Sequence, residues 1–113
     1  KDLMRMAAGM AMLEKEYNQK INLGKLAEES GFSLPHFIRS FTAVYGLSPL
    51  QYILQLRISK AAELLENSTM TISQIGDLCG FDDSNYFSRV FRKRMGCSPR
   101  PYRNRQYRNH TEL

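Results

Sequence analysis

The chain repeats one sequence pattern twice, over residues 23–52 and again over residues 72–102. Each copy places a Gly-Phe pair before an Arg-x-Phe segment, and each ends in a Gly-x-Ser-Pro-x-x-Tyr segment. The copies are offset by 49 residues at the Gly-Phe pair and by 50 residues after it, so the second copy holds one more residue in its turn. Two copies are too few for a solenoid, in which neighbouring repeats bury one another. The repeat therefore predicts two copies of one small folding unit.

The length of the chain makes it unlikely that each copy folds alone. The 113 residues suit one domain, or two subdomains that cannot stand apart. Each repeat is about 30 residues long, below the size at which a single core normally suffices. Residues 49–66 are the candidate for a shared element between the copies. The apolar content of 42% supports a packed core over a disordered chain.

Apolar residues recur at spacings of three and four, the pattern of amphipathic helices. The clearest cases are residues 2–18, with Leu3, Met6, Met10, Leu13 and Tyr17 on one face, and residues 34–45, with Phe37, Phe41 and Val44 on one face. Further helices are predicted over residues 23–30, about 49–66, 72–79 and 84–95, and a last short one opens at Ser98-Pro99 before the chain frays. No segment alternates apolar and polar residues as a strand does. The sequence therefore predicts an all-α fold of about seven helices.

Residues that start helices support these boundaries. Asn22 is placed to cap the helix that follows it. Ser48 with Gln51, and Thr71 with Gln74, have the spacing of a capping box, in which side chain and backbone of the two residues bond reciprocally.

Both copies also satisfy the local requirements of a helix-turn-helix. This motif needs a small residue where the helices approach, a glycine in the turn, and an apolar inner face on the second helix. The residues at these positions are Ala27, Gly31 and Phe37 in the first copy, and Gly76, Gly80 and Phe87 in the second. Glycine inside a helix costs about 1 kcal/mol relative to alanine, so Gly76 predicts a close helix contact. Two matches with the same Gly-x-Ser-Pro flank make the motif a specific signal.

The charge is distributed unevenly along the chain. Residues 1–88 hold eight Lys/Arg and ten Asp/Glu, a net of −2, whereas residues 89–113 hold eight Lys/Arg and one Asp/Glu, a net of +7. A basic block at the end of a near-neutral fold is typical of a protein that binds a polyanion. The alternative is a solvated basic tail with no partner.

With these motifs in place, the chain resembles the DNA-binding domain of the AraC/XylS family of bacterial transcription regulators. The resemblance covers nearly all of residues 5–103 and is most specific in RISKAAELLENSTMTISQIGDLCGFDDSNYFSRVFRKRMGCSP, residues 57–99. It implies two helix-turn-helix subdomains joined by a long rigid helix, with recognition helices in successive major-groove segments on one face of the DNA. The expected division is a first subdomain at 1–48, a linking helix at 49–66, a second subdomain at 67–104 and a basic C-terminal tail at 105–113.

The residues expected to contact bases lie on the recognition helices, opposite the buried phenylalanines. They are Leu34, Pro35, Ile38 and Arg39 in the first copy, and Ser84, Asn85, Ser88 and Arg89 in the second; the same positions face DNA in the family that the chain resembles. Arginine can bond a guanine edge in two places, and asparagine an adenine. The alternative for either arginine is a phosphate contact or a pair with a local acid such as Glu28 or Asp77. The first helix offers few hydrogen-bonding groups but could touch a thymine methyl, so we expect the second unit to carry at least as much sequence information.

Phosphate contacts are expected from helix starts and from the basic block. The starts of both recognition helices offer free N–H groups and a positive dipole end, with Ser33 and Ser84 placed there. The expected phosphate-contacting residues are Ser33, Arg92, Lys93, Arg94, Arg100 and Arg103. Arg57, on the linking helix, could reach the DNA backbone or form an ion pair with the core, and both alternatives stay open.

Other functional classes find little support. His36 and His110 are the only histidines, and they lack the Cys/His spacing of a zinc site, so we expect no metal and no cofactor. No nucleophile elbow, phosphate-binding glycine loop or clustered acid pair points to an enzyme. The longest apolar run is far short of the ~18 residues of a membrane span. Cys79 and Cys97 are expected to be a buried small residue and a turn residue in a reducing cytoplasm.

The sequence thus predicts sequence-specific binding to double-stranded DNA for transcription regulation. Two alternatives are a helical protein-interaction module with a solvated basic tail, and a basic tail that docks on an anionic membrane. The chain begins at Lys1 without an initiator Met, so we expect a fragment of a longer protein. The resemblance implies an N-terminal effector or dimerisation domain in that protein, and RNA polymerase is a possible partner.

Overall fold

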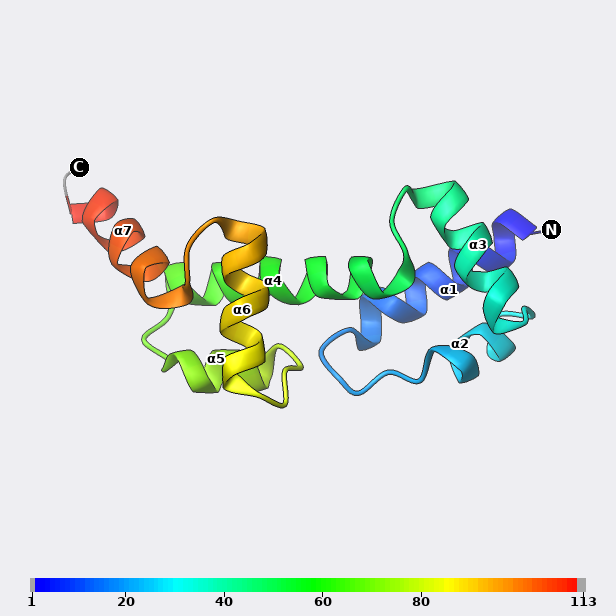
Figure 1. Cartoon of the computed structure of the whole chain (residues 1–113), viewed down its shortest axis with the longest axis horizontal. Helices are drawn as coiled ribbons and strands as arrows, with labels where there is room; N and C mark the ends of the chain where they lie inside the picture. The colour runs from blue at the N-terminus through cyan, green and yellow to red at the C-terminus, as the bar shows by residue number, and fades with distance from the viewer. Residues whose placement is uncertain (1, 112–113) are drawn as a thin grey trace. The chain divides into compact units, whose positions relative to one another are not determined.

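Seven α-helices make up the part of the chain that the structure describes, with no strand among those residues (Figure 1). The structure is a computed structural model; it describes residues 2–111, with side chains as far as residue 106. The helices are α1 (Asp2–Glu16), α2 (Leu23–Glu29), α3 (Leu34–Tyr45), α4 (Pro49–Asn67), α5 (Ile72–Leu78), α6 (Ser84–Met95) and α7 (Pro99–Thr111). The predicted all-α class is confirmed. The last helix is longer than expected, because α7 continues to Thr111 where the sequence suggested fraying.

The predicted start signals form the hydrogen bonds that define them. The Asn22 side chain accepts from the Lys25 backbone N–H at 3.1 Å. In each capping box the N–H of the first residue donates to the glutamine side chain and the glutamine N–H donates back to the hydroxyl. These distances are 2.9 and 3.2 Å for Ser48 with Gln51, and 2.9 and 3.1 Å for Thr71 with Gln74. These bonds satisfy N–H groups that a helix start leaves without partners.

The chain divides into two compact units inside α4, at Lys1–Leu56 (unit 1) and Arg57–Leu113 (unit 2). The first half of α4 therefore closes unit 1, and its second half opens unit 2. Each unit holds one helix-turn-helix, α2–α3 in the first and α5–α6 in the second. The shared element expected from the sequence is thus present, with one half built into each unit.

The core of unit 1 gathers side chains from all four of its helices. Its buried members are Met6, Leu13, Leu26, Ala27, Phe32, Phe37, Phe41 and Ile53. Aromatic rings run through it, with centroids 5.7 Å apart for Phe37 and Phe41 and 5.9 Å apart for Phe41 and Tyr52. Two residues assigned to inner faces by their spacing are not buried, because they lie near helix ends where the neighbouring helices no longer cover them: Leu3 is 71% exposed and Val44 is 47% exposed.

The core of unit 2 repeats this arrangement. The second half of α4 contributes Ile58, Ala61 and Leu65, and the helix-turn-helix contributes Ile75, Cys79, Phe81, Phe87 and Phe91, all buried. The ring centroids of Phe87 and Phe91 are 5.9 Å apart, and those of Phe91 and Tyr102 are 5.3 Å apart. A row of packed aromatic rings therefore runs through the core of each unit.

The repeat extends further toward the N-terminus than sequence identity revealed. In unit 1 the Tyr52 hydroxyl donates to the Glu14 carboxylate at 3.1 Å, and in unit 2 Tyr102 hydrogen bonds to Glu66. Burial, together with these carboxylates, raises the pKa of both tyrosine hydroxyls. Glu14 and Glu66 are 52 residues apart. The helix α1 therefore occupies in unit 1 the place that the second half of α4 occupies in unit 2. Each unit is consequently a four-helix repeat around one helix-turn-helix.

Candidate nucleic-acid interface

The inward faces of α3 and α6 determine which residues face outward. Phe37 and Phe41 are fully buried on α3, as are Phe87 and Phe91 on α6. The eight predicted base-contacting residues remain accessible on these helices: Leu34, Pro35, Ile38, Arg39, Ser84, Asn85 and Arg89 are exposed and Ser88 is half-buried. The structure thus presents each predicted set together on one helix surface.

A glycine occupies the turn of each helix-turn-helix, as predicted. Gly31 has a φ of +87° and Gly80 a φ of +101°, in the left-handed region that favours glycine. At Gly76, a Cβ atom would lie 2.8 Å from a ring carbon of the buried Phe87. The close approach of α5 to α6 is confirmed, and it explains a glycine inside a helix.

The extra residue of the second turn changes the start of α6. Asp83 caps this helix, with its carboxylate accepting from the Asn85 N–H at 2.9 Å, and exposed Asp82 precedes it. Ser84 is the first helical residue and not the cap. Two carboxylates therefore lie near the positive end of the α6 dipole, and Ser84 is assigned no phosphate contact below. At α3 the cap is Ser33, whose hydroxyl accepts from the His36 N–H at 3.4 Å.

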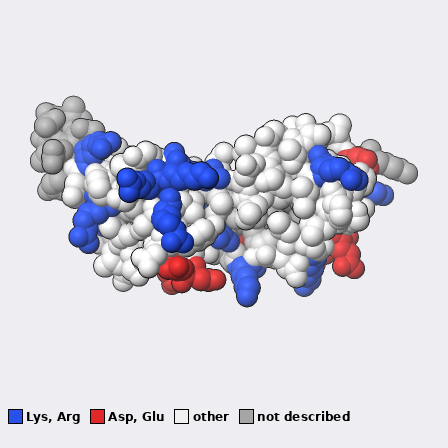
Figure 2. All heavy atoms as spheres, in the orientation of Figure 1, with Lys and Arg blue, Asp and Glu red and all other residues white. Residues whose placement is uncertain are grey.

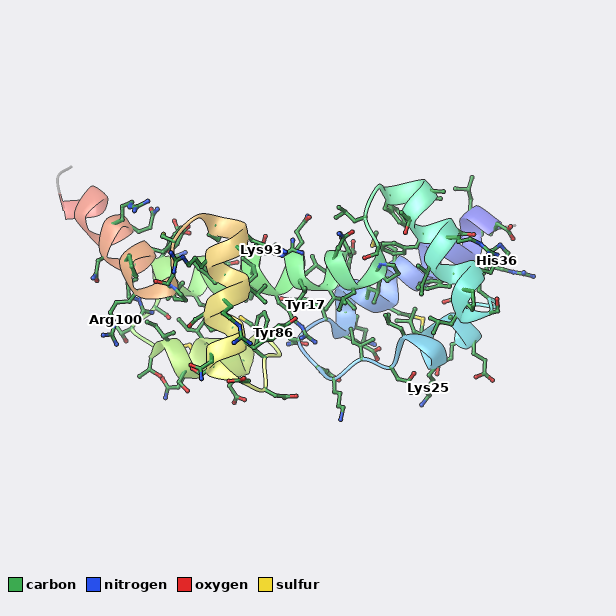
Figure 3. All side chains as sticks on the ribbon, in the orientation of Figure 1. Tyr17, Lys25, His36, Tyr86, Lys93 and Arg100 are labelled. Carbon is green, nitrogen blue, oxygen red and sulfur yellow. The ribbon has the colours of Figure 1, made fainter. Side chains whose placement is uncertain are left out.

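The exposed basic residues of unit 2 are concentrated on α6 and the start of α7. Arg92, Lys93, Arg94 and Arg100 are all exposed, and Figure 2 shows Lys and Arg side chains over these helices, with Asp and Glu near the α5–α6 turn. Figure 3 places Lys93 on α6 and Arg100 at the start of α7. These four residues, called the basic surface below, form a positively charged region beside the outward face of α6.

Arg103, unlike these four residues, contacts the end of α4. Its guanidinium donates to the backbone carbonyls of Leu65 and Ser68, at 3.1 and 3.2 Å, where α4 ends. These bonds satisfy carbonyls that a helix end leaves without partners, so Arg103 holds α7 against the end of α4. The sequence did not indicate this role, because the partners lie 38 and 35 residues away.

Arg57 makes a contact that the sequence did not indicate. Its guanidinium lies over the ring of Phe81, 5.6 Å from the centroid, in a cation–π arrangement. Burial lowers the pKa of Arg57, and the charge of Asp82 acts in the opposite direction. The side chain is half-buried, and it joins α4 to the turn that leads into α6.

Unit 2 has a polar concavity beside the outward face of α6. The cavity has a volume of about 710 Å³, and its polar lining includes Ser73, Ser84, Ser88, Ser98, Arg100, Arg103 and Asn104. Hydroxyl, amide and guanidinium groups from α5, α6 and α7 meet there, and such groups suit anionic oxygens. The sequence predicted several of these residues individually but not the hollow that brings them together.

Comparisons with known proteins agree with this architecture. A family model described as a helix-turn-helix domain, of the AraC type, matches residues 26–105. This chain belongs to the AraC-type helix-turn-helix family. Such domains bind specific DNA sequences for transcription regulation, and the family consists of regulators and not of enzymes.

Two curated proteins illustrate the similarity of this AraC-type domain to regulators. It is 38% identical over 95 residues to the MmsAB operon regulatory protein of Pseudomonas aeruginosa, covering 84% of this chain and 31% of that protein. It is 37% identical over 94 residues to the transcriptional activator RhaS of Escherichia coli, covering 83% and 34%. The chain therefore spans about a third of the length of the curated relatives it matches.

Solved structures share the fold of the AraC-type domain. The DNA-binding domain of AdpA, in complex with a target DNA, has a TM-score of 0.89 at 26% identity, covering 96% of this chain and 98% of that one. An AraC-type regulator from Chromobacterium violaceum has a TM-score of 0.82 at 27% identity, covering 92% and 93%. These are structures that this domain resembles over almost its whole length.

The remaining sequence expectations concern sites other than the DNA surface. Cys79 is fully buried, and burial raises its pKa to about 11, as befits an inert core thiol. Among residues 2–106, whose side chains the structure describes, no three His, Cys, Asp or Glu side chains gather as metal ligands would. None of the helices in that range is both long and apolar enough to cross a membrane.

Proposed function

We propose that this AraC-type domain binds double-stranded DNA with the outward faces of α3 and α6 in successive major-groove segments. The observation that carries the proposal is that the two helices pack in the same way, each within its own unit. Each buries two phenylalanines and leaves the predicted base-contacting residues accessible. A helix of this width fits the major groove of B-DNA, where each base pair shows a distinct pattern of donors and acceptors.

Base contacts are assigned to eight residues. On α3 they are Leu34, Pro35, Ile38 and Arg39, and on α6 they are Ser84, Asn85, Ser88 and Arg89. Arg39 and Arg89 suit the two acceptors of guanine, and Asn85 suits adenine. Both arginines are exposed, so each is accessible to a base edge.

Phosphate contacts are assigned to Ser33 and to the basic surface. Arg100 also lines the polar cavity of unit 2, where the hydroxyls of Ser73 and Ser98 add donors for a phosphate oxygen. Arg103 is left out of the set, because its guanidinium already bonds the end of α4. Contacts of this kind supply affinity and register and carry no sequence information.

The binding site of one chain should be asymmetric. Two different recognition helices on one polypeptide require two different DNA segments, whereas a palindrome reflects a symmetric dimer. We expect the two segments to lie about one helical turn, ~10 base pairs, apart. Footprinting measures the protected length directly.

The role in the whole protein follows by analogy with the relatives. RhaS is named a transcriptional activator, and we propose activation of transcription in the cytoplasm for this protein as well. An N-terminal effector or dimerisation domain and contact with RNA polymerase complete the proposal, since the matched relatives are about three times as long as the segment they share with this chain.

A competition gel shift tests the proposed function. The site is first selected from random duplexes, and the complex is then challenged with a large excess of unrelated DNA. We expect the complex on the selected site to survive a competitor excess that removes the complex on a shuffled site. Equal loss of both complexes would leave only charge-driven binding and would refute sequence-specific recognition.

A further inference from the structure

We propose that α3 selects thymine through the 5-methyl group, using Leu34 and Ile38 as an apolar reading surface. The inference rests on the proposed DNA binding and names the base that this surface recognises. In the major groove thymine alone presents a methyl group, which is the apolar feature by which a base pair can be distinguished there.

The two side chains form one stripe on the outward face of α3. Leu34 and Ile38 are each 38% exposed, and residues four apart lie one above the other on a helix. Phe37 and Phe41 are fully buried on the adjoining face of the helix. Two large aliphatic side chains are therefore partly exposed along one edge of the surface assigned to DNA.

Hydrogen-bonding capacity around the stripe is low. Aliphatic side chains neither donate nor accept hydrogen bonds, and Pro35 between them has no backbone N–H. The Thr42 hydroxyl, one turn further on, donates to the Ile38 carbonyl at 2.7 Å and so is directed at its own helix. Arg39 is the one base-directed residue of α3 that can donate to a base edge. The other three residues assigned to bases on α3, Leu34, Pro35 and Ile38, can discriminate bases only by apolar contact.

The internal repeat supplies a comparison within the same chain. Ser84 and Ser88 occupy the positions in unit 2 that Leu34 and Ile38 occupy in unit 1, at the offset of 50 residues. There the two hydroxyls line the polar cavity of unit 2. Equivalent helix positions therefore carry hydroxyls in one unit and aliphatic groups in the other, which assigns methyl recognition to α3 alone.

The stripe is also continuous with the rest of the proposed DNA surface. Ser33 directly precedes Leu34 in the chain, and Arg39 directly follows Ile38. A protein seated on this stripe would compete with DNA for the same helix face. The occupant consistent with these neighbours is the methyl-bearing edge of an A·T base pair.

Uracil substitution tests the proposal, because uracil pairs as thymine does and lacks only the methyl group. Each thymine of the selected site is replaced singly by deoxyuridine, and the dissociation constant of each duplex is measured. We expect at least one position to lose about fourfold in affinity, the effect of one buried methyl group. A selected site in which no thymine is sensitive to uracil would overturn the inference while leaving specific DNA binding intact.

Variants then assign the sensitive position to α3. In Leu34→Ser and Ile38→Ser, which introduce the residues of unit 2, the thymine and uracil duplexes should bind equally at the position that each side chain contacts. Ser84→Ala and Ser88→Ala, in the base contacts proposed for α6, are the matched variants: whatever they do to affinity, the ratio of thymine to uracil binding at the α3 positions should stay that of the wild type. Both leucine and isoleucine are exposed, so folding should persist, and circular dichroism checks this. A uracil effect that survives both α3 variants would refute the assignment, whereas failure of the unmodified site to bind specifically would refute the proposed function.

Discussion

The two recognition helices are alike on the inside and different on the outside. Each has twelve residues, ends at a glycine and buries two phenylalanines at matching positions. The outward face of α3 is largely aliphatic and its last turn holds no basic residue, whereas α6 carries serine and asparagine and ends with Arg92, Lys93 and Arg94. Packing thus requires the same residues in both units, while the solvent faces are free to diverge. One fold can therefore present two different outward surfaces on one chain.

The largest expected effect tests the likeness of the inner faces. Phe37→Ala and Phe87→Ala each remove a fully buried ring, and each should lower the free energy of unfolding by about 3–5 kcal/mol. Urea denaturation of the two variants measures this loss. A variant that lost less than about 1 kcal/mol would show that its ring is not part of an equivalent core.

The second prediction concerns the outward arginines. Arg89→Ala should weaken binding to the selected site by about 1–3 kcal/mol and relax the preference at one base pair. Arg39→Ala is the matched variant in unit 1 and should relax a different base pair. Titration on selected and shuffled duplexes separates base contact from phosphate contact, because an arginine that weakens both duplexes equally binds phosphate.

The third prediction tests the charge difference between the helices. Removing one residue of the basic surface that contacts a phosphate should lower the slope of log K against log salt by about 0.9 and leave the preferred sequence unchanged. Thr42→Ala, at the position of unit 1 that corresponds to Arg92, should leave the slope unchanged. Equal slopes for wild type and all four single variants of the basic surface would place the electrostatic contact elsewhere.

The smallest expected effect on DNA binding belongs to Arg103. Because its guanidinium bonds two backbone carbonyls of unit 2, Arg103→Ala should cost about 1–3 kcal/mol of stability, the penalty for carbonyls left without partners. The salt slope should remain that of the wild type. If the slope of log K against log salt fell by about 0.9 in Arg103→Ala, Arg103 would be a phosphate-contacting residue after all.

The sequence predicted what local chemistry decides. Helix starts at Asn22, Ser48 and Thr71 depend on residues three positions apart, and the close approach at Gly76 on a glycine that a helix otherwise disfavours, so each could be inferred without a structure. The outward placement of the candidate base contacts followed from helical periodicity alone.

Contacts between residues far apart in sequence could not be predicted from local sequence patterns. The bonds from Arg103 to the end of α4 and the position of Arg57 over Phe81 join residues far apart in sequence. The sequence therefore predicted a phosphate contact for Arg103 and gave no sign of its bonds to backbone carbonyls. The sequence showed one extra residue in the second turn. Only the structure shows that Asp83 in this turn caps α6.

The central claim is that α3 and α6 each read a different DNA segment. The most direct test is random-site selection with the wild type and with Arg39→Ala and Arg89→Ala, sequenced to give the base preference at every position. The account predicts an asymmetric wild-type site, with each variant losing preference at one position and the two positions lying in separate segments about one helical turn apart. Variants that lose affinity for all sequences equally, or that lose preference at the same position, would contradict it.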